Sequence, residues 1–124
     1  MKITTFNPLI VSKDADSAIA LFEELGFEKR HTPFVDTGDR QVVRTRMKDE
    51  NGFYVDISKV DTIPRDMTAI RMNVSNFQEA YELLTAHGFK KAPGIEEVDL
   101  EKARALLMVA PSGFAIEVIE HIKV

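Results

Sequence analysis

Two carboxylates at equivalent places in two similar stretches are the residues of this chain best suited to chemistry. Asp56 lies within Lys48–Lys59 (KDENGFYVDISK) and Glu117 within Ala110–Val124 (APSGFAIEVIEHIKV), each four residues after the glycine of a turn. Both therefore fall in the middle of an alternating strand. A carboxylate held on the inner side of such a strand can ligate a metal ion, bind a polar group of a ligand, or pair with an arginine.

Arg71 is the arginine best placed to pair with Glu117. It lies in an apolar stretch with Asn73, and if Met72 and Val74 point toward a helix, Arg71 and Asn73 share the opposite, inward side. An arginine–carboxylate pair in a cavity can bind a carboxylate or amide of a ligand, or simply neutralise itself. Both interpretations remain open.

Other side chains have both a functional and a structural interpretation. His121 shares a face with Glu117 but lies near the chain end, where a solvated histidine is the more common case. Phe6 and Tyr54 can line an apolar pocket, although core packing is the usual fate of such residues. The acidic stretch Gly94–Glu101 is either a solvated surface loop or a flap over a cavity mouth.

Composition and charge exclude several classes of protein. The chain has 124 residues, the size of one domain, with 44% hydrophobic and 29% charged residues. Its formal net charge of -4 and its scattered lysines and arginines argue against a nucleic-acid partner. It has no cysteine, which excludes disulfides and thiolate metal sites. No apolar run is long enough to cross a membrane, so we expect a cytoplasmic protein with no membrane partner.

The same order of elements occurs twice along the chain. The first half predicts strands at Ile3–Val11, Phe27–Val35, Gln41–Lys48 and Phe53–Ser58, with a helix before Gly26. The second half predicts strands at Thr68–Val74, Phe89–Ala92, Ala103–Ala110 and Phe114–Ile122, with a helix at Phe77–His87. The repeat has a period of about 60 residues. It divides a single domain, 1–124, into module one (1–60), a connector (61–66) and module two (67–124).

The fold class that this repeat predicts is α+β, with two β-α-β-β-β modules. Each module forms a curved mixed sheet with one helix on its outside, and the two modules close around a central cavity. Alternation along the last strands places Val55, Ile57, Ile116 and Val118 under the helices. Tyr54, Asp56, Glu117 and His121 then face the other way, into the cavity.

These features resemble the glyoxalase/bleomycin-resistance/extradiol dioxygenase superfamily, the vicinal oxygen chelate fold. The resemblance rests on the paired modules, on the helix endings Leu25-Gly26-Phe27 and His87-Gly88-Phe89, and on the closing motif from Pro111 to Val118 (PSGFAIEV). It covers about Ile3 to Glu120. The superfamily includes isomerases, dioxygenases, epimerases and drug-binding proteins, so the fold does not fix the activity.

The resemblance also implies where a metal would bind. Metal-dependent members carry one ligand on the first and one on the last strand of each module. The last-strand positions fall on Asp56 and Glu117, whereas the first-strand positions fall on Phe6 and Ala69, which cannot ligate a metal. Two carboxylates alone are a weak site, since transition ions normally take three or four protein ligands. We therefore expect no cofactor, with a divalent metal as the less favoured case.

Three functional hypotheses follow. The first is a metal-independent small-molecule binding protein of the bleomycin-resistance-like kind, and the second is a metal-dependent glyoxalase-like lyase or isomerase that uses Asp56 and Glu117, joined by His121 or water. The third is a structural dimer module with a collapsed pocket. Exposed edge strands such as Ile3–Val11 also favour a homodimer. The predicted ligand pocket consists of Phe6, Tyr54, Asp56, Ala69, Arg71, Asn73, Glu117 and His121.

Overall fold

The computed structural model describes residues 1–31, 43–95, 97–100 and 102–121. The chain forms two compact units. The N-terminal unit is Asn7–Thr68, and the C-terminal unit combines Met1–Phe6 with Ala69–Val124. The first residues join the C-terminal unit because the backbone N–H of Lys2 donates to Ser75 Oγ at 2.7 Å, while the N–H of Ser75 donates to the carbonyl of Lys2 at 2.9 Å.

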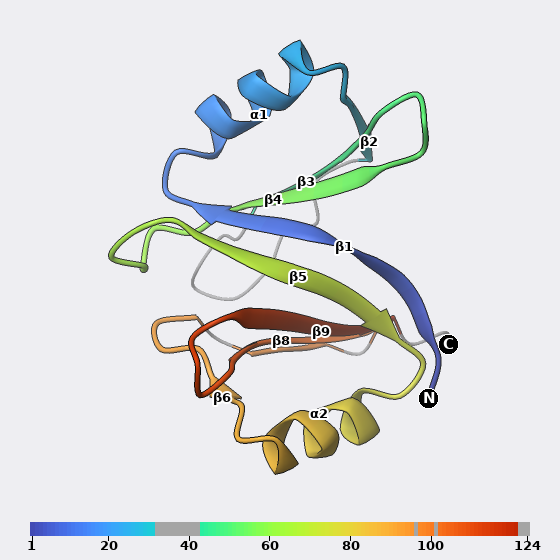
Figure 1. Cartoon of the computed structure of the whole chain (residues 1–124), viewed down its shortest axis with the longest axis vertical. Coiled ribbons are helices and arrows are strands. Elements are labelled where there is room, and N and C mark those ends of the chain that lie inside the picture. The colour runs from blue at the N-terminus through green and yellow to red at the C-terminus, as the bar shows by residue number, and fades with distance from the viewer. Residues whose placement is uncertain (32–42, 96, 101, 122–124) are drawn as a thin grey trace. The chain divides into compact units, whose positions relative to one another are not determined.

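The N-terminal unit is a sheet with one helix. Its elements are the part of β1 (Ile3–Ser12) from Asn7 onward, α1 (Ala15–Glu24), β2 (Glu28–His31), β3 (Val43–Lys48) and β4 (Tyr54–Lys59). The strand order is β2-β3-β4-β1, in which β4 runs parallel to β1 and antiparallel to β3. Figure 1 shows α1 on one side of these strands. The predicted strands at Ile3–Val11 and Phe53–Ser58 are confirmed, whereas residues 32–42, which end one prediction and begin another, lie outside the described residues.

The sequence around α1 explains where this helix begins, ends and packs. The Asp14 side chain accepts the Ser17 backbone N–H at 3.2 Å, and hydrogen bonds from the Ser17 hydroxyl and backbone hold the pKa of Asp14 below its ordinary value of 3.8. Gly26 ends the helix at a φ of 102°. The helix packs through a cluster comprising Ala15, Ile19, Met47, Val55 and Ile57. Leu21 in the helix and Leu25 at its C-cap do not join this cluster and are 53% and 62% exposed.

The C-terminal unit repeats this topology. Its elements are β5 (Met67–Val74), α2 (Phe77–Ala86), β6 (Lys90–Lys91), β7 (Val98–Leu100), β8 (Ala103–Val109) and β9 (Ala115–His121). The order β6-β8-β9-β5 matches β2-β3-β4-β1 strand for strand, with β7 added on β8. The predicted repeat of β-α-β-β-β is therefore confirmed. The short β7 lies within Gly94–Glu101, where the sequence suggested only an irregular loop.

A second core lies under α2, which Figure 1 shows against one side of β8 and β9. Asn76 caps the helix by accepting the Glu79 backbone N–H at 3.0 Å. The buried cluster comprises Met72, Val74, Phe77, Ala80, Leu84, Phe89, Leu106, Met108, Ala110 and Val118. Val118 and Met72 point toward the helix as alternation predicted, so Glu117 and Arg71 lie on the opposite side of their sheet.

The class of fold is α+β, as predicted. The described strands do not close into a barrel, because β2 and β6 are edge strands. The central cavity between modules stays a prediction. Neither α1 nor α2, the helices of the described part of the chain, has the length and apolar character that crossing a bilayer requires.

Candidate functional site

Each sheet has one face that packs against its helix and one that does not, and the predicted site residues lie on the second kind. In the N-terminal unit we call this the Asp56 face; strand register places on it Asn7, Leu9, Arg44, Arg46, Lys48, Tyr54, Asp56 and Ser58. In the C-terminal unit we call it the Glu117 face, which carries Ala69, Arg71, Asn73, Leu107, Ala115, Glu117, Ile119 and His121.

Asp56 is the centre of a buried polar cluster on its face. Its side chain is 0% exposed, and its Oδ2 accepts a hydrogen bond from Asn7 Nδ2 at 2.6 Å. The same Nδ2 donates to the Pro8 carbonyl at 2.9 Å, and Asn7 Oδ1 accepts from Arg46 Nη2 at 3.3 Å. Asn7 itself is only 7% exposed. Both ends of its amide are therefore used within the protein, as buried polar groups require.

Two cations lie over one aromatic ring on the same face. The Arg46 guanidinium carbon is 4.2 Å from the centroid of Tyr54, and Lys48 Nζ is 5.3 Å from it. Both distances are within the range of cation–π attraction. All three side chains are half-buried. Register places Lys48 opposite Tyr54 and Arg46 opposite Asp56, so the strand β3 supplies the positive charges of this face.

Glu117 has an equivalent position on the other unit, with an arginine from a different strand. Arg71 on β5 is its direct partner in register, and Leu107 on β8 is its partner on the other side. Glu117 is 4% and Arg71 9% exposed. Arg71 Nε also donates to Asn73 Oδ1 at 3.2 Å. The sequence had named Arg71 as the candidate partner of Glu117, and the register brings the two together.

The other predicted pocket residues differ in how far they are buried. Ala69 is buried on the Glu117 face, but His121 is exposed at the end of β9. Phe6 is 63% exposed and belongs to the C-terminal unit. The side chain of β1 that reaches Asp56 belongs to Asn7, the residue after Phe6. Leu9 pairs with Asp56, and because side chains alternate along a strand, Asn7 lies on the same face of the sheet as Leu9.

Sequence reasoning missed Asn7, Arg46 and Lys48. One signal was available for the two cations, since Arg44, Arg46 and Lys48 alternate within a predicted strand and so must share one face. No comparable signal marks Asn7, because its role depends on which phase of β1 faces β4.

The donor atoms on these faces do not fit the divalent metal that the fold implies. The first-strand positions are Asn7, whose amide is already engaged at both ends, and Ala69, which has no donor. The described residues contain no group of three or more His, Cys, Asp or Glu side chains that could hold a metal ion. An arginine also stands opposite each carboxylate. A divalent ion would meet positive charge there and too few ligands.

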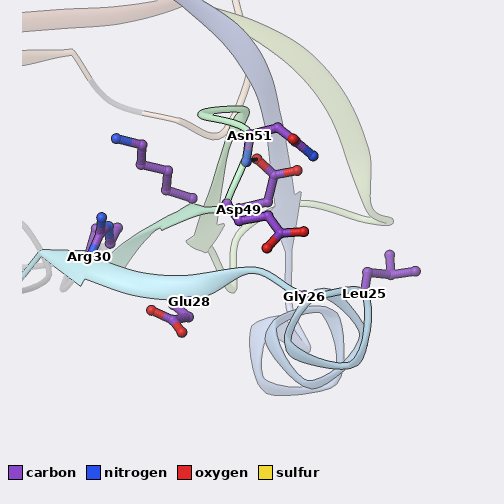
Figure 2. A pocket seen from close by; sticks show the side chains of 8 residues that line it. Leu25, Gly26, Glu28, Arg30, Asp49 and Asn51 are labelled. Carbon is purple, nitrogen blue, oxygen red and sulfur yellow. Dashed lines mark hydrogen bonds between the residues drawn. The ribbon is translucent and has the colours of Figure 1, made fainter.

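A surface depression of about 390 Å³ lies elsewhere on the N-terminal unit, between the end of α1, β2 and the turn from β3 to β4. It is lined by Leu25, Gly26, Glu28, Arg30, Lys48, Asp49, Glu50 and Asn51. Figure 2 shows these side chains spread along the strands and the turn rather than directed at one point. Asp49 Oδ1 is occupied by the Asn51 and Phe53 backbone N–H groups at 3.1 and 2.8 Å. The depression lacks the convergent polar groups of a specific site.

Comparison with known proteins identifies the fold. No family model matches the chain, and no curated protein matches it in sequence. Solved structures do match. The E144Q mutant of glyoxalase I from Zea mays superimposes with a TM-score of 0.70 at 14% identity, covering 98% of this chain and 45% of that one. This chain therefore spans less than half the length of the maize protein.

Two shorter structures match along nearly their whole length. Methylmalonyl-CoA epimerase from Mycobacterium tuberculosis has a TM-score of 0.65 at 15% identity, covering 98% of this chain and 90% of that one. A glyoxalase/bleomycin resistance protein/dioxygenase superfamily member from Vibrio splendidus 12B01 has a TM-score of 0.60 at 13% identity, with 96% and 99% covered. The chain has the vicinal oxygen chelate fold.

Proposed function

We propose that this chain is a small-molecule binding protein of the bleomycin-resistance-like kind that works without a metal ion. One observation carries the proposal: each carboxylate at a last-strand position has an arginine as its direct cross-strand neighbour, Arg46 beside Asp56 and Arg71 beside Glu117. Directly opposed side chains on one face interact. A guanidinium there neutralises the carboxylate and repels a divalent cation, while both groups can still hydrogen-bond to an organic ligand.

Each unit has its own candidate contacts with a ligand, on the face that its helix leaves uncovered. In the C-terminal unit these are Glu117, Arg71 and Asn73, with Ala69 as an apolar wall. In the N-terminal unit they are Tyr54 and the Asp56 cluster. A few fixed polar groups among apolar side chains are typical of small-molecule sites. Leu107 and Leu9, which flank the two carboxylates in register, supply such apolar surroundings.

The competing candidate is a metal-dependent lyase or isomerase. It is favoured by the structural similarity to glyoxalase I and methylmalonyl-CoA epimerase. At 14% and 15% identity this similarity extends to the fold alone. His121 or water would have to complete the ligand set of such an enzyme. The experiment below decides between the two.

Metal analysis of the purified protein, followed by thermal-shift titration with Ni²⁺, Zn²⁺, Mn²⁺ and Fe²⁺, tests the proposal. We expect less than stoichiometric metal and no rise in melting temperature, together with stabilisation by aromatic or amphipathic compounds from a small library. Any bound species raises the apparent stability by mass action, so the readout covers both cases. Stoichiometric metal, or a metal-dependent rise that Glu117→Gln abolishes, would overturn the proposal.

A matched variant separates the site from general effects of charge removal. Glu82→Gln removes a carboxylate from the exposed surface of α2, where Glu82 accepts from Gln78 Nε2 at 3.3 Å. We expect it to leave every titration unchanged.

If no compound and no metal stabilises the protein, the collapsed-pocket dimer module is the remaining hypothesis. Size-exclusion chromatography with light scattering then measures whether the chain is a homodimer.

A further inference from the structure

The short strand β7 is attached to the C-terminal unit through a single neighbour. Among the described strands it pairs with β8 alone, through the partners Val98–Ala105, Asp99–Arg104 and Leu100–Ala103. So short an edge segment makes few backbone hydrogen bonds, and segments of this kind open at a lower free energy than the rest of a fold. The side chains around β7 must therefore do much to hold it in place.

One side chain of β7 packs on the Glu117 face. Val98 is 9% exposed and forms a small apolar cluster with Ala105, its partner on β8, and Ile119 on β9. Ile119 lies two residues after Glu117 and pairs with Asn73 on β5. The cluster therefore borders the candidate ligand contacts of this unit, and opening of β7 would expose that apolar border.

Charged side chains hold β7 from the side of the sheet that faces α2. Asp99 Oδ1 lies 3.7 Å from Arg104 Nε, and Oε2 of Glu97, the residue before β7, lies 3.4 Å from Arg104 Nη2. Lys91 on β6 adds a third contact, with its Nζ 3.5 Å from Glu97 Oε1. We call these four side chains the β7 latch.

Arg104 joins the β7 latch to the core of the unit. Its guanidinium carbon is 4.2 Å from the ring centroid of Phe77, a buried residue at the start of α2. Glu120, the partner of Arg104 on β9, accepts the Phe77 backbone N–H at 2.6 Å. The cation is thus held by the core, while its partners Glu97 and Asp99 belong to the segment that it retains.

The β7 latch is of the kind that salt weakens. Its three contacts measure 3.4, 3.5 and 3.7 Å, whereas a short charge-assisted hydrogen bond measures about 2.7–2.9 Å. The Asp99 side chain is 68% exposed and the Arg104 side chain 30%. Ion pairs that reach solvent contribute little individually and are screened at high ionic strength. The closed position of β7 should therefore lose stability as salt is added.

We propose that β7 is a strap that opens independently of the rest of the C-terminal unit, and that the β7 latch makes its opening depend on ionic strength. The strap regulates the proposed site. In the closed position Val98 packs against Ala105 and Ile119 at the border of the Glu117 face, and in the open position it leaves them exposed. This consequence for ligand binding rests on the proposed function, whereas the opening itself does not.

Hydrogen–deuterium exchange of the full chain, measured by mass spectrometry of its peptides, tests the proposal. We expect the amides of β7 to exchange at least about 10-fold faster than those of β9. Exchange in β7 should also rise about 3- to 5-fold between about 0.02 and 0.5 M sodium chloride. Exchange in β9 should not respond to salt, because β9 is paired on both sides, with β5 and β8.

Arg104→Gln should reproduce the effect of salt. It removes two ion pairs and the contact with the Phe77 ring, so exchange in β7 should rise about 5- to 10-fold at low salt and lose most of its salt dependence. Arg104→Lys keeps the charge and should restore part of both. Lys90→Gln is the matched control, since Lys90 is an exposed cation on β6 outside the β7 latch. It should leave exchange in β7 unchanged.

Exchange in β7 that does not respond to salt, or that rises equally in Arg104→Gln and Lys90→Gln, would overturn the inference. Equal exchange in β7 and β9 would overturn it as well, because β7 would then open only with the whole unit. The salt series uses the natural chain, so it decides the question even where Arg104→Gln lowers the stability of the fold.

The metal titration judges the proposed function separately. Stoichiometric metal would refute the metal-independent site and leave the strap in place, whereas salt-independent exchange would refute the strap and leave the site.

Discussion

Replacement of Asn7 by alanine tests the arrangement of the Asp56 cluster most directly. The variant removes the donor that lies 2.6 Å from Asp56 Oδ2 and the acceptor of the Arg46 guanidinium. Asp56 is 0% and Asn7 7% exposed, so water does not readily replace the lost partner. The perturbation therefore acts on a buried hydrogen bond rather than a solvated one.

The expected magnitude follows from that burial. A hydrogen bond to a charged group contributes about 1.5–3 kcal/mol, and leaving a buried partner unsatisfied costs about 1–3 kcal/mol. We therefore expect Asn7→Ala to lower the free energy of unfolding by about 2–3 kcal/mol. For a chain of this length each kcal/mol corresponds to about 4 °C in melting temperature.

A double-mutant cycle isolates the interaction itself. Urea denaturation of the natural chain, Asn7→Ala, Asp56→Ala and the double variant gives the coupling free energy between the two side chains. We expect about 1–3 kcal/mol, with the double variant less destabilised than the sum of the single ones. Gln78→Ala, on the exposed surface of α2, should change stability by less than about 0.5 kcal/mol.

A coupling energy below about 0.5 kcal/mol would refute the reasoning, since contacts of that size are indistinguishable from additive behaviour. It would mean that Asn7 and Asp56 do not depend on each other. The proposal that Asn7 is engaged and unable to ligate a metal would then lose its support.

Three further predictions concern the elements that hold the two faces. Gly88→Ala should lower the free energy of unfolding by about 1–3 kcal/mol more than Gly26→Ala does. A Cβ at Gly88 would lie 2.8 Å from Pro111 Cγ, while a Cβ at Gly26 meets nothing within 4 Å. Equal losses of the two variants in urea denaturation would contradict this. Asn76→Ala should cost about 1 kcal/mol through loss of the α2 cap, and Asn76→Ser should restore most of it. The stability that Asp14 contributes is fully present above pH 3.8 and lost as pH falls through its lowered pKa; Asp14→Asn should flatten this acid dependence, and an unchanged profile would disprove the assignment.

The repeated order of elements could be predicted from sequence because each element carries a local signal. The helices have capping residues, Asp14 and Asn76, and end before glycines at positive φ, Gly26 and Gly88. Strand alternation likewise predicted that Val118 faces a helix and Glu117 does not. These signals act within a few residues, so no knowledge of the tertiary structure is needed to use them.

Local signals failed where neighbouring strands decided the outcome. The short β7 exists because Val98 pairs with Ala105 on β8, and nothing in the acidic stretch alone indicates that partner. Leu21 and Leu25 have the spacing of an apolar face, yet the sheet presents its core to Ala15 and Ile19 instead.

The sequence by itself determined the class of fold, the repeat and the position of both carboxylates in the middle of equivalent strands. Only the tertiary structure decided which side chains stand beside them: Asn7 rather than Phe6, and Arg46 in addition to Arg71. The reason is that a shift of one residue in register moves every side chain of a strand to the other face. Hydrogen bonding between strands that are distant in sequence fixes that register, and with it the charge that surrounds each carboxylate.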